Sequence, residues 1–553
     1  MTVRCSSGRA VLLAPILIAV LVAVLVAGCS SSGERATAPR NESSPSATAA
    51  AEPSPTPSPS STRTGTDPTR RAPGVTAAER RRAERAVDAM SLDQRAGQVI
   101  VASYGGTAPP VDLVRGEHLA GVVTFSDNIR SVDHLRAGLR RLQRADRRPW
   151  PVFTSVDQEG GGIARVDETV TKFPALMTYG AARRTDLARR AAEASGQELR
   201  AIGFTAVFAP VADVTSGPSD PTIGSRSAGS SPALVADVVE ASVAGYQQAG
   251  ILPVIKHFPG HGSVPADSHR QLPVQDASRA ALDKRDFVPF ERAAAAGAPA
   301  IMVGHIDVRA IDPGTPSSVS RKVVGGVLRD DFGYRGLVVT DSMQMAGLTQ
   351  EYGDAEAPVA ALRAGVDLLL MPADPVTAKD AIVDAVRDGT LSTARLDQAA
   401  ERVVAHLIHV GATAAKPFSR HDRISQQASA AAVTVTDGPC KGRLVGDSVQ
   451  PRGDPTAVRR FEDAARAAGL RTGGGDSVAF IGPEGGRASA DVVVATDTPY
   501  PLGDSSAPVR IATYGETPGA MRALVDVLLG KRPAPGRLPV KVDGVTRDGC
   551  SPR

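Results

Sequence analysis

One short segment of the sequence concentrates side chains that can hold and move protons. It reads Lys256-His-Phe-Pro-Gly-His-Gly262 and continues to Asp267-Ser-His269, so it holds three of the nine histidines of the chain. A histidine titrates near neutral pH, and a neighbouring carboxylate fixes its tautomer. One histidine in such a Pro/Gly turn would more often be structural, capping backbone groups. Three of them beside a lysine and an aspartate favour a functional site.

The elements that position this segment form a regular series of short apolar runs. Helix-like stretches with apolar residues three and four positions apart separate most runs, as at 188–201 and 234–249. Strands alternating with helices pair in parallel, so residues 76–415 are expected to form a (β/α)8 TIM-type barrel. A doubly wound open sheet is the alternative. The eight runs are Val99–Ser103, Gly121–Phe125, Val152–Val156, Ala206–Val211, Leu252–Lys256, Ala300–Gly304, Leu337–Thr340 and Asp367–Met371.

A barrel collects its active-site residues at the carboxyl ends of its strands, and the unusual polar residues follow the runs directly. This coincidence is the strongest argument from the residues alone that the chain is an enzyme. The residues are Asp157, Asp213, Lys256, His257, His305 and Asp341.

A second, smaller domain is expected over residues 416–553, after a helical stretch near 392–411. Apolar runs predict strands, and stretches near 455–469 and 519–530 predict helices, which together indicate an α/β sandwich. No phosphate-binding glycine pattern occurs there, because Gly473-Gly-Gly475 indicates only a turn. The expected strands are Ala432–Thr436, Val478–Ile481, Asp491–Ala495 and Val509–Thr513.

Several motifs in this order resemble glycoside hydrolase family 3, in its β-N-acetylglucosaminidase branch. The first is Lys256-His-Phe-Pro-Gly-His-Gly262 with Asp267-Ser-His269, and the others fall along the barrel in the family's order. Each motif alone is weak, but together they are highly specific. The others are Asp157-Gln-Glu-Gly-Gly161 with Arg165, Phe208-Ala-Pro-Val-Ala-Asp213, Ile223-Gly-Ser-Arg226-Ser, Ile301-Met-Val-Gly-His305 and Val338-Val-Thr-Asp341-Ser.

The resemblance implies a retaining exo-glycosidase that releases terminal β-N-acetylglucosamine from cell-wall glycans such as peptidoglycan fragments. Asp341 would be the nucleophile, and His269, held by Asp267, would be the acid/base in place of a second carboxylate. Asp341 could instead cap the helix that follows its strand.

The resemblance also assigns sugar binding to a set of residues whose hydrogen-bonding groups suit hydroxyls and an N-acetyl carbonyl. Each of them could instead sit in a structural ion pair. The residues are Asp157, Arg165, Arg226, Lys256 and His257.

Three departures from the family's pattern stand close to these residues. Gly162 replaces an arginine, and Ala228 stands where phenylalanine is common. Ser263-Val264-Pro265 replaces the usual Asp-Thr, which puts in doubt how the loop that carries Asp267 and His269 is anchored.

The N-terminus has the parts of a bacterial lipoprotein signal. Arg4 and Arg9 precede an apolar run, and Cys29 follows the small residues Ala27 and Gly28. Residues 1–28 are therefore expected to be a signal peptide, Cys29 the lipidated residue, and the Ser/Pro-rich 29–75 an extended tether. An uncleaved transmembrane anchor is the alternative. Either reading places the protein outside the cytoplasm, held at the cell membrane.

The cysteine content and the net charge of the sequence indicate few further binding partners. Cys440 and Cys550 form an even pair, for which an oxidising compartment favours a disulfide. Net charge is +4 with no long basic run, so nothing suggests nucleic acid. No cofactor or metal is expected, and the protein is expected to be a monomer whose partners are its glycan substrate and the membrane.

Three other functions compete with a glycosidase. His257, His261, Asp267 and His269 could bind a metal, although zinc sites usually show fixed short spacings and the first strand lacks a His-x-His. The scaffold could also bind glycans without catalysis. Phosphate could replace water as the acceptor and give N-acetylglucosamine 1-phosphate.

Overall fold

The structure, a computed structural model, describes residues 74–166, 169–482, 485 and 488–550. The expected signal peptide and Cys29 lie outside these residues, as does the tether up to residue 73. Within the described part of the chain, no helix is long and apolar enough to cross a membrane. All described residues belong to one compact unit, Gly65–Arg553.

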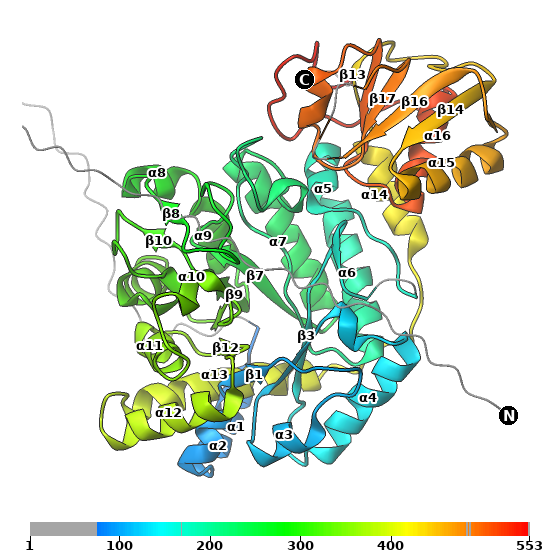
Figure 1. Cartoon of the computed structure of the whole chain (residues 1–553). Coiled ribbons are helices and arrows are strands. Elements are labelled where there is room, and N and C mark those ends of the chain that lie inside the picture. Colours follow the sequence, from blue (N-terminus) through cyan, green and yellow to red (C-terminus); the bar gives the residue numbers. More distant parts are fainter. Residues whose placement is uncertain (1–73, 167–168, 483–484, 486–487, 551–553) are drawn as a thin grey trace, which may run out of the picture. The chain divides into compact units, whose positions relative to one another are not determined.

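Eight short strands pair in parallel in the order of the chain (Figure 1). A parallel bridge between Val339 and Leu368 joins the two ends of this order. The predicted (β/α)8 barrel is confirmed, and the doubly wound alternative is wrong, because such a sheet changes its strand order at a switch point. The strands are β1 (Ile100–Ala102), β2 (Gly121–Thr124), β3 (Phe153–Val156), β6 (Ala206–Val207), β7 (Leu252–Phe258), β9 (Ala300–Val303), β11 (Leu337–Thr340) and β12 (Leu369–Leu370).

The barrel interior is a packed core. Val101, Met302 and Val339 belong to one buried cluster, which also includes Val403 and Leu407 of the second helix after the last strand. Neighbouring residues on the same strands point outward, since side chains alternate along a strand. Buried on both faces, these strands consist almost wholly of apolar residues, which is why the sequence reveals them.

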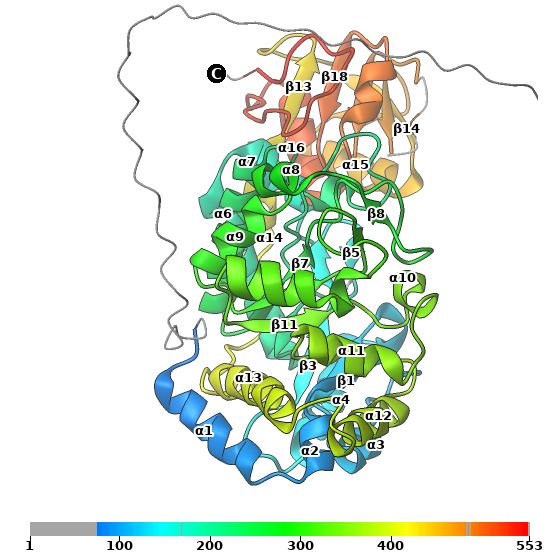
Figure 2. The same ribbon diagram turned by 90° about the vertical axis from the view of Figure 1, so that its left-hand side faces the viewer.

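The helices follow the strands, and local caps explain where several begin. Thr76 and Glu79 form a capping box before α1, and Asp374 accepts from two backbone N–H groups before α12. Figures 1 and 2 both show α1 beside α13. The helices are α1 (Ala77–Asp88), α2 (Leu92–Gly97), α3 (Val111–Gly116), α4 (Val132–Ala145), α5 (Leu176–Ala182), α6 (Thr185–Ile202), α7 (Pro232–Gln248), α8 (Arg279–Lys284), α9 (Val288–Ala295), α10 (Ala346–Thr349), α11 (Glu356–Ala364), α12 (Pro375–Arg387), α13 (Thr393–Gly411) and the π-helical η4 (Lys322–Asp331).

A second sheet follows the barrel, in the order β13-β18-β17-β16-β14-β15. All its pairs are parallel except that of β13 with β18. This mixed sheet with its helices matches the expected α/β domain. Its elements are α14 (Asp422–Ala432), β13 (Thr434–Asp437), β14 (Ser448–Gly453), α15 (Pro455–Ala468), β15 (Arg471–Thr472), β16 (Asp476–Ile481), β17 (Val492–Ala495), β18 (Val509–Ala512) and α16 (Pro518–Leu528).

The two faces of this sheet are covered differently. Phe461 of α15 and Leu524 of α16 pack on one face. On the other face, Leu538 and Val540 of the C-terminal coil share a buried cluster with Met177 of α5 in the barrel. The hydrophobic core therefore continues from the barrel into the sheet domain.

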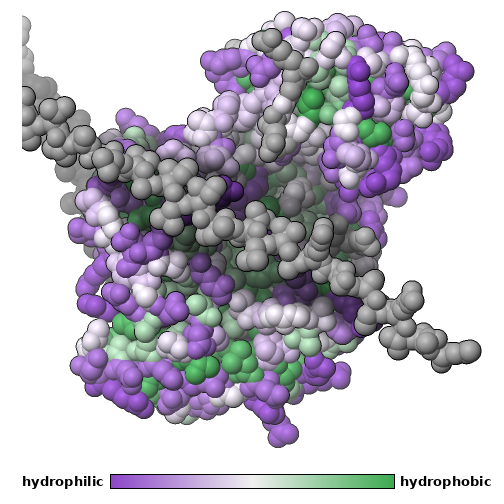
Figure 3. Space-filling view, in the orientation of Figure 1, coloured by the Kyte–Doolittle hydropathy of each residue, from purple (hydrophilic) through white to green (hydrophobic). Residues whose placement is uncertain are grey.

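A covalent bond links the two ends of the sheet domain. The outer surface of the domain is polar. Cys440 and Cys550 form a disulfide. Hydrophilic side chains cover much of the domain's surface visible in Figure 3.

Candidate active site

The polar residues that follow the barrel strands lie at one end of the barrel, because all eight strands run the same way. Asp157 comes directly after β3, and Asp341 directly after β11. Lys256 and His257 lie within β7, which continues two residues beyond its predicted end. Their peptide bond is cis.

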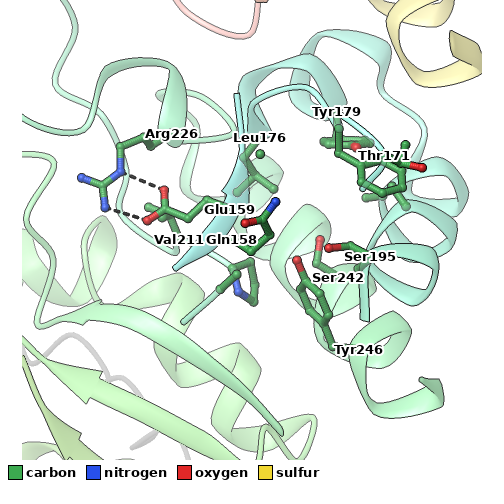
Figure 4. Close-up of a pocket in the computed structure, with 17 residues that line it drawn as sticks. Gln158, Glu159, Thr171, Leu176, Tyr179, Ser195, Val211, Arg226, Ser242 and Tyr246 are labelled. Carbon is green, nitrogen blue, oxygen red and sulfur yellow. Dashed lines mark hydrogen bonds and ion pairs between the residues drawn. The ribbon is translucent and has the colours of Figure 1, made fainter. Parts of the chain in front are cut away.

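The centre of the site is a network of charged groups. Nζ of Lys256 lies 2.5 Å from Oδ1 of Asp157 and 2.6 Å from Oε1 of Glu159. The guanidinium of Arg226 meets the same Glu159 carboxylate in two hydrogen bonds of 2.8 and 2.9 Å (Figure 4). The network therefore joins three of the predicted sugar-binding residues, Asp157, Arg226 and Lys256, through a fourth group.

Glu159 is the functional residue that the sequence reasoning missed. Burial raises the pKa of its carboxyl, but the charges of Arg226 and Lys256 outweigh burial and hold that pKa well below its ordinary value. Its signal was present in the sequence: Asp157 and Glu159 are two residues apart in an extended segment, so both side chains point to the same side.

Asp213 holds the histidines of the segment in place. It is fully buried, and its carboxylate lies 2.7 Å from Nδ1 of His257 and accepts from the backbone N–H of His261 at 2.6 Å. Because a carboxylate only accepts, Nδ1 of His257 carries the proton. Nε2 of His257 is then free to accept, and Nη2 of Arg226 lies 3.4 Å from it.

Asp341 sits in a positive environment. Burial raises the pKa of its carboxyl, but the rings of His257 and His305, the N–H of Ser342 and the ammonium of Lys256 together lower it below the ordinary value. Asp341 is therefore ionised at neutral pH. The helix-cap alternative is wrong, since α10 begins five residues later, with Met345 as its N-cap.

His305 supports the turn that carries Asp341. It is fully buried, with Nδ1 2.7 Å from the hydroxyl of Ser318 and Nε2 3.0 Å from the carbonyl oxygen of Ser342. Since a carbonyl only accepts, Nε2 carries the proton and Nδ1 accepts from Ser318. Burial lowers the pKa of His305, which keeps the ring neutral in this arrangement.

His269 and Asp267 form a pair on an exposed loop. Nδ1 of His269 lies 2.7 Å from Oδ1 of Asp267, which also accepts from the backbone N–H of His269 at 3.0 Å. The side chain of His269 is 65% exposed. The pair makes no hydrogen bond to the charged network around Lys256 within the described residues.

The unusual stretch before this pair is anchored. The hydroxyl of Ser263 donates to Asp286 at 2.7 Å and accepts from the amide of Gln275 at 2.7 Å. Val264 is fully buried. The departure from the family's pattern therefore leaves the start of the loop fixed.

Arg165 stands apart from the other predicted sugar-binding residues. Its guanidinium lies over the ring of Phe125, 5.8 Å from the centroid. Only its backbone N–H reaches Asp157, donating to the carbonyl oxygen at 3.3 Å.

The alternative metal ligands do not converge. His257 turns to Asp213, His261 places Nε2 2.9 Å from the hydroxyl of Ser268, and His269 turns to Asp267. Across the part of the chain that the structure describes, no group of three or more His, Cys, Asp or Glu side chains is arranged to hold a metal ion.

A cavity lies behind the strand that carries Glu159. Ser195, Ser242 and Tyr246 line one side of it, and Glu159 and Arg226 border the other (Figure 4). Among the described residues that line it are Glu159 and Arg226 of the charged network, but none of the predicted catalytic groups.

A barrel with an ionised aspartate, a histidine–aspartate pair and a charged hydrogen-bonding network at its carboxyl end defines a class, the barrel glycoside hydrolases. Residues 91–406, more than half of the chain, match the family described as "Glycosyl hydrolase family 3 N terminal domain". The chain belongs to glycosyl hydrolase family 3.

Its relatives by sequence carry hexosaminidase names. Beta-hexosaminidase A of Pseudoalteromonas piscicida is 34% identical over 287 residues, 48% of this chain and 48% of that protein. Beta-hexosaminidase LpqI of Mycobacterium tuberculosis is 32% identical over 331 residues, 57% of this chain and 82% of that protein. The chain thus spans about half the length of the first relative and most of the second.

Solved structures that resemble this chain cover different shares of it. A family 3 beta-N-acetylglucosaminidase from Paenibacillus sp. str. FPU-7 gives a TM-score of 0.75 at 28% identity, covering 82% of this chain and 99% of that one. M. tuberculosis LpqI gives a TM-score of 0.55 at 30% identity, covering 59% of this chain and 96% of its own.

Proposed function

We propose that the protein is a retaining exo-β-N-acetylhexosaminidase that hydrolyses terminal N-acetylglucosamine from glycans. The observation that carries this proposal is the ionised Asp341 at the barrel end that also holds the Lys256 network. The names of the relatives support the substrate class, because both the hexosaminidases and the Paenibacillus structure are named for N-acetylhexosamine release.

In the proposed reaction Asp341 attacks the anomeric carbon, and the glycosidic bond breaks as the glycosyl–enzyme ester forms. His269 gives its Nε2 proton to the leaving oxygen. In the second step His269 takes a proton from water, whose oxygen attacks the same carbon and releases Asp341. Asp267 fixes the tautomer, because its carboxylate at Nδ1 leaves Nε2 as the exchanging position.

The sugar itself is proposed to bind the charged network. Asp157 accepts from hydroxyls, while Lys256, Arg226 and Nε2 of His257 offer polar groups beside it. Glu159 neutralises the two cations and fixes their direction. For Arg165 the proposal requires a rotation of the side chain away from Phe125.

The cellular setting is part of the proposal. We infer a lipoprotein anchored through Cys29 on the outer face of the cell membrane and acting on peptidoglycan fragments as a monomer. The disulfide supports an oxidising compartment. Labelled fatty acid should enter the wild-type protein in its bacterial host, and Cys29→Ala should abolish both labelling and membrane retention.

The decisive experiment incubates the protein with an aryl β-N-acetylglucosaminide and an aryl β-glucoside, with and without phosphate and a chelator. The proposal expects turnover of the first substrate alone, with free N-acetylglucosamine as product and no effect of the chelator. No turnover of the N-acetylglucosaminide would refute it. N-acetylglucosamine 1-phosphate as the product would instead identify a phosphorylase, and loss of activity in chelator would revive the metal hypothesis.

A further inference from the structure

The sheet domain touches the loop that carries Arg226. Arg226 ends the short 3-10 helix η2 (Gly224–Arg226), and its neighbour Ser225 is buried, with 9% of its surface exposed. The Ser225 hydroxyl donates to the carboxylate of Asp497, which lies 272 residues away in the sheet domain. Asp497 follows β17, in the middle of the sheet.

Two more contacts from the sheet domain hold the same loop. The backbone N–H of Ser230 donates to the carbonyl oxygen of Pro539 at 3.2 Å. Gly229 presses against that oxygen so closely that a Cβ there would come within 2.5 Å of it. The sheet domain, which carries none of the proposed catalytic residues, therefore contacts this loop at Ser225 and again at Gly229 and Ser230.

The barrel holds the loop only in part. Asp220 accepts from the backbone N–H groups of Thr222 and Ile223 at 3.0 and 2.8 Å, which shapes the entry to η2. Ser227 donates to the carbonyl oxygen of Asp213 at 2.7 Å, which fixes the exit. Between these points, the side-chain hydrogen bond that the structure records for Ser225 is the one to Asp497.

We propose that Asp497 is a positioning residue for sugar binding: through Ser225 it sets η2 so that Arg226 meets Glu159 and His257. This inference rests on the proposed function and deepens it, because it makes the second domain part of the sugar site without a catalytic group of its own.

The geometry explains why so small a contact matters. The guanidinium of Arg226 makes two parallel bonds to Glu159 and lies 3.4 Å from Nε2 of His257, so its direction is fixed by three partner atoms. A planar guanidinium tolerates little rotation in such a paired arrangement. A shift of η2 by a fraction of an ångström would weaken the hold on substrate.

The test compares Ser225→Ala, Asp497→Ala, the Ser225→Ala/Asp497→Ala double variant and Asp497→Asn in the full chain. Each alanine variant should raise KM for the aryl N-acetylglucosaminide about tenfold with kcat nearly unchanged, since a hydrogen bond to a charged group is lost from ground-state and transition-state binding alike. The double variant should be no worse than either single one. Asp497→Asn keeps an acceptor oxygen and should restore KM to within about twofold of wild type.

Ser425→Ala is the matched control. Ser425 is buried in α14, and its hydroxyl donates to the carbonyl oxygen of Lys172 at 2.6 Å, so it also links the barrel to the following domain. This variant should lower the melting temperature without changing KM. An equal rise of KM in Ser425→Ala, or no rise in Ser225→Ala, would overturn the proposal.

Titration calorimetry with N-acetylglucosamine separates this inference from the proposed function. The dissociation constant should rise about tenfold in Ser225→Ala and Asp497→Ala, whether or not the protein turns over the aryl glycoside. A wild-type protein that binds but does not hydrolyse refutes the proposed function alone. Unchanged binding in both variants refutes the positioning role alone.

Discussion

The guanidinium of Arg226 and the carboxylate of Glu159 form two parallel hydrogen bonds of 2.8 and 2.9 Å, although they belong to different βα units of the barrel. Lys256 binds the same carboxylate. The carboxylate of Glu159 is therefore a negative centre of the sugar site, and it orients two hydrogen-bond donors, Arg226 and Lys256.

Replacing Glu159 by its uncharged isostere should destabilise the folded protein. Glu159→Gln removes the negative charge that pairs with the buried cations Arg226 and Lys256, so the free energy of unfolding should fall by about 3 kcal/mol. Urea unfolding measures the loss, with Glu351→Gln, an exposed residue, as the control. A change below about 0.5 kcal/mol would contradict the account, since that is the range of surface substitutions.

The aspartate after β11 should carry most of the chemistry. Asp341→Asn removes the nucleophile and should lower kcat by about four orders of magnitude, while the far-UV circular dichroism spectrum stays native. A variant that keeps kcat within tenfold of wild type would support the non-catalytic, glycan-binding alternative.

The effect of replacing the exposed His269 on kcat/KM should depend on the leaving group of the substrate. His269→Ala should lower kcat/KM at least about a hundredfold for an alkyl N-acetylglucosaminide, whose oxygen needs a proton, and much less for a dinitrophenyl glycoside. Stability should change by under about 0.5 kcal/mol, because the side chain is 65% exposed. Equal losses on both substrates would argue against a role as acid.

A buried histidine outside the candidate site gives a prediction about the pH dependence of stability. His406 in α13 is 1% exposed, and burial lowers its pKa to about 4. The unfolded chain therefore binds a proton that the folded chain does not, and the stability contributed by the neutral ring is lost as pH falls from 6.5 to about 4. The free energy of unfolding should fall by about 3 kcal/mol more in wild type than in His406→Phe over this window. If the free energy of unfolding depends on pH in the same way in both proteins, His406 does not cause this loss of stability. His134→Phe serves as the control.

Much of the fold could be predicted because buried parallel strands are nearly continuous apolar runs. All eight barrel strands were predicted, as were the four apolar strands of the sheet domain. β14 and β15 were missed. The first reads Ser-Val-Gln-Pro-Arg-Gly and is mostly accessible, and both residues of the second are exposed, so neither shows an apolar run.

Only those residues of the candidate site that lie at the end of a predicted strand could be predicted from the sequence. Asp157, Lys256, His257 and Asp341 were found in this way and lie together. The contact between Ser225 and Asp497 could not be found, because neither residue type is unusual and 272 residues separate them. Such a contact depends on how two cores meet, and the sequence pattern of each core is independent of the other.

The disulfide should stabilise the sheet domain and, through the shared core, the barrel. Cys440 and Cys550 close a loop with a sequence separation of 110, so replacing both by serine should lower the free energy of unfolding by about 2–4 kcal/mol. Trp150, the single tryptophan of the chain, lies in the barrel, and its fluorescence reports barrel unfolding. Because Met177 of the barrel packs in the same cluster as Leu538, the fluorescence midpoint in urea should fall together with the far-UV circular dichroism midpoint. A fluorescence midpoint that stays at the wild-type value while the circular dichroism midpoint falls would mean that the two domains unfold independently.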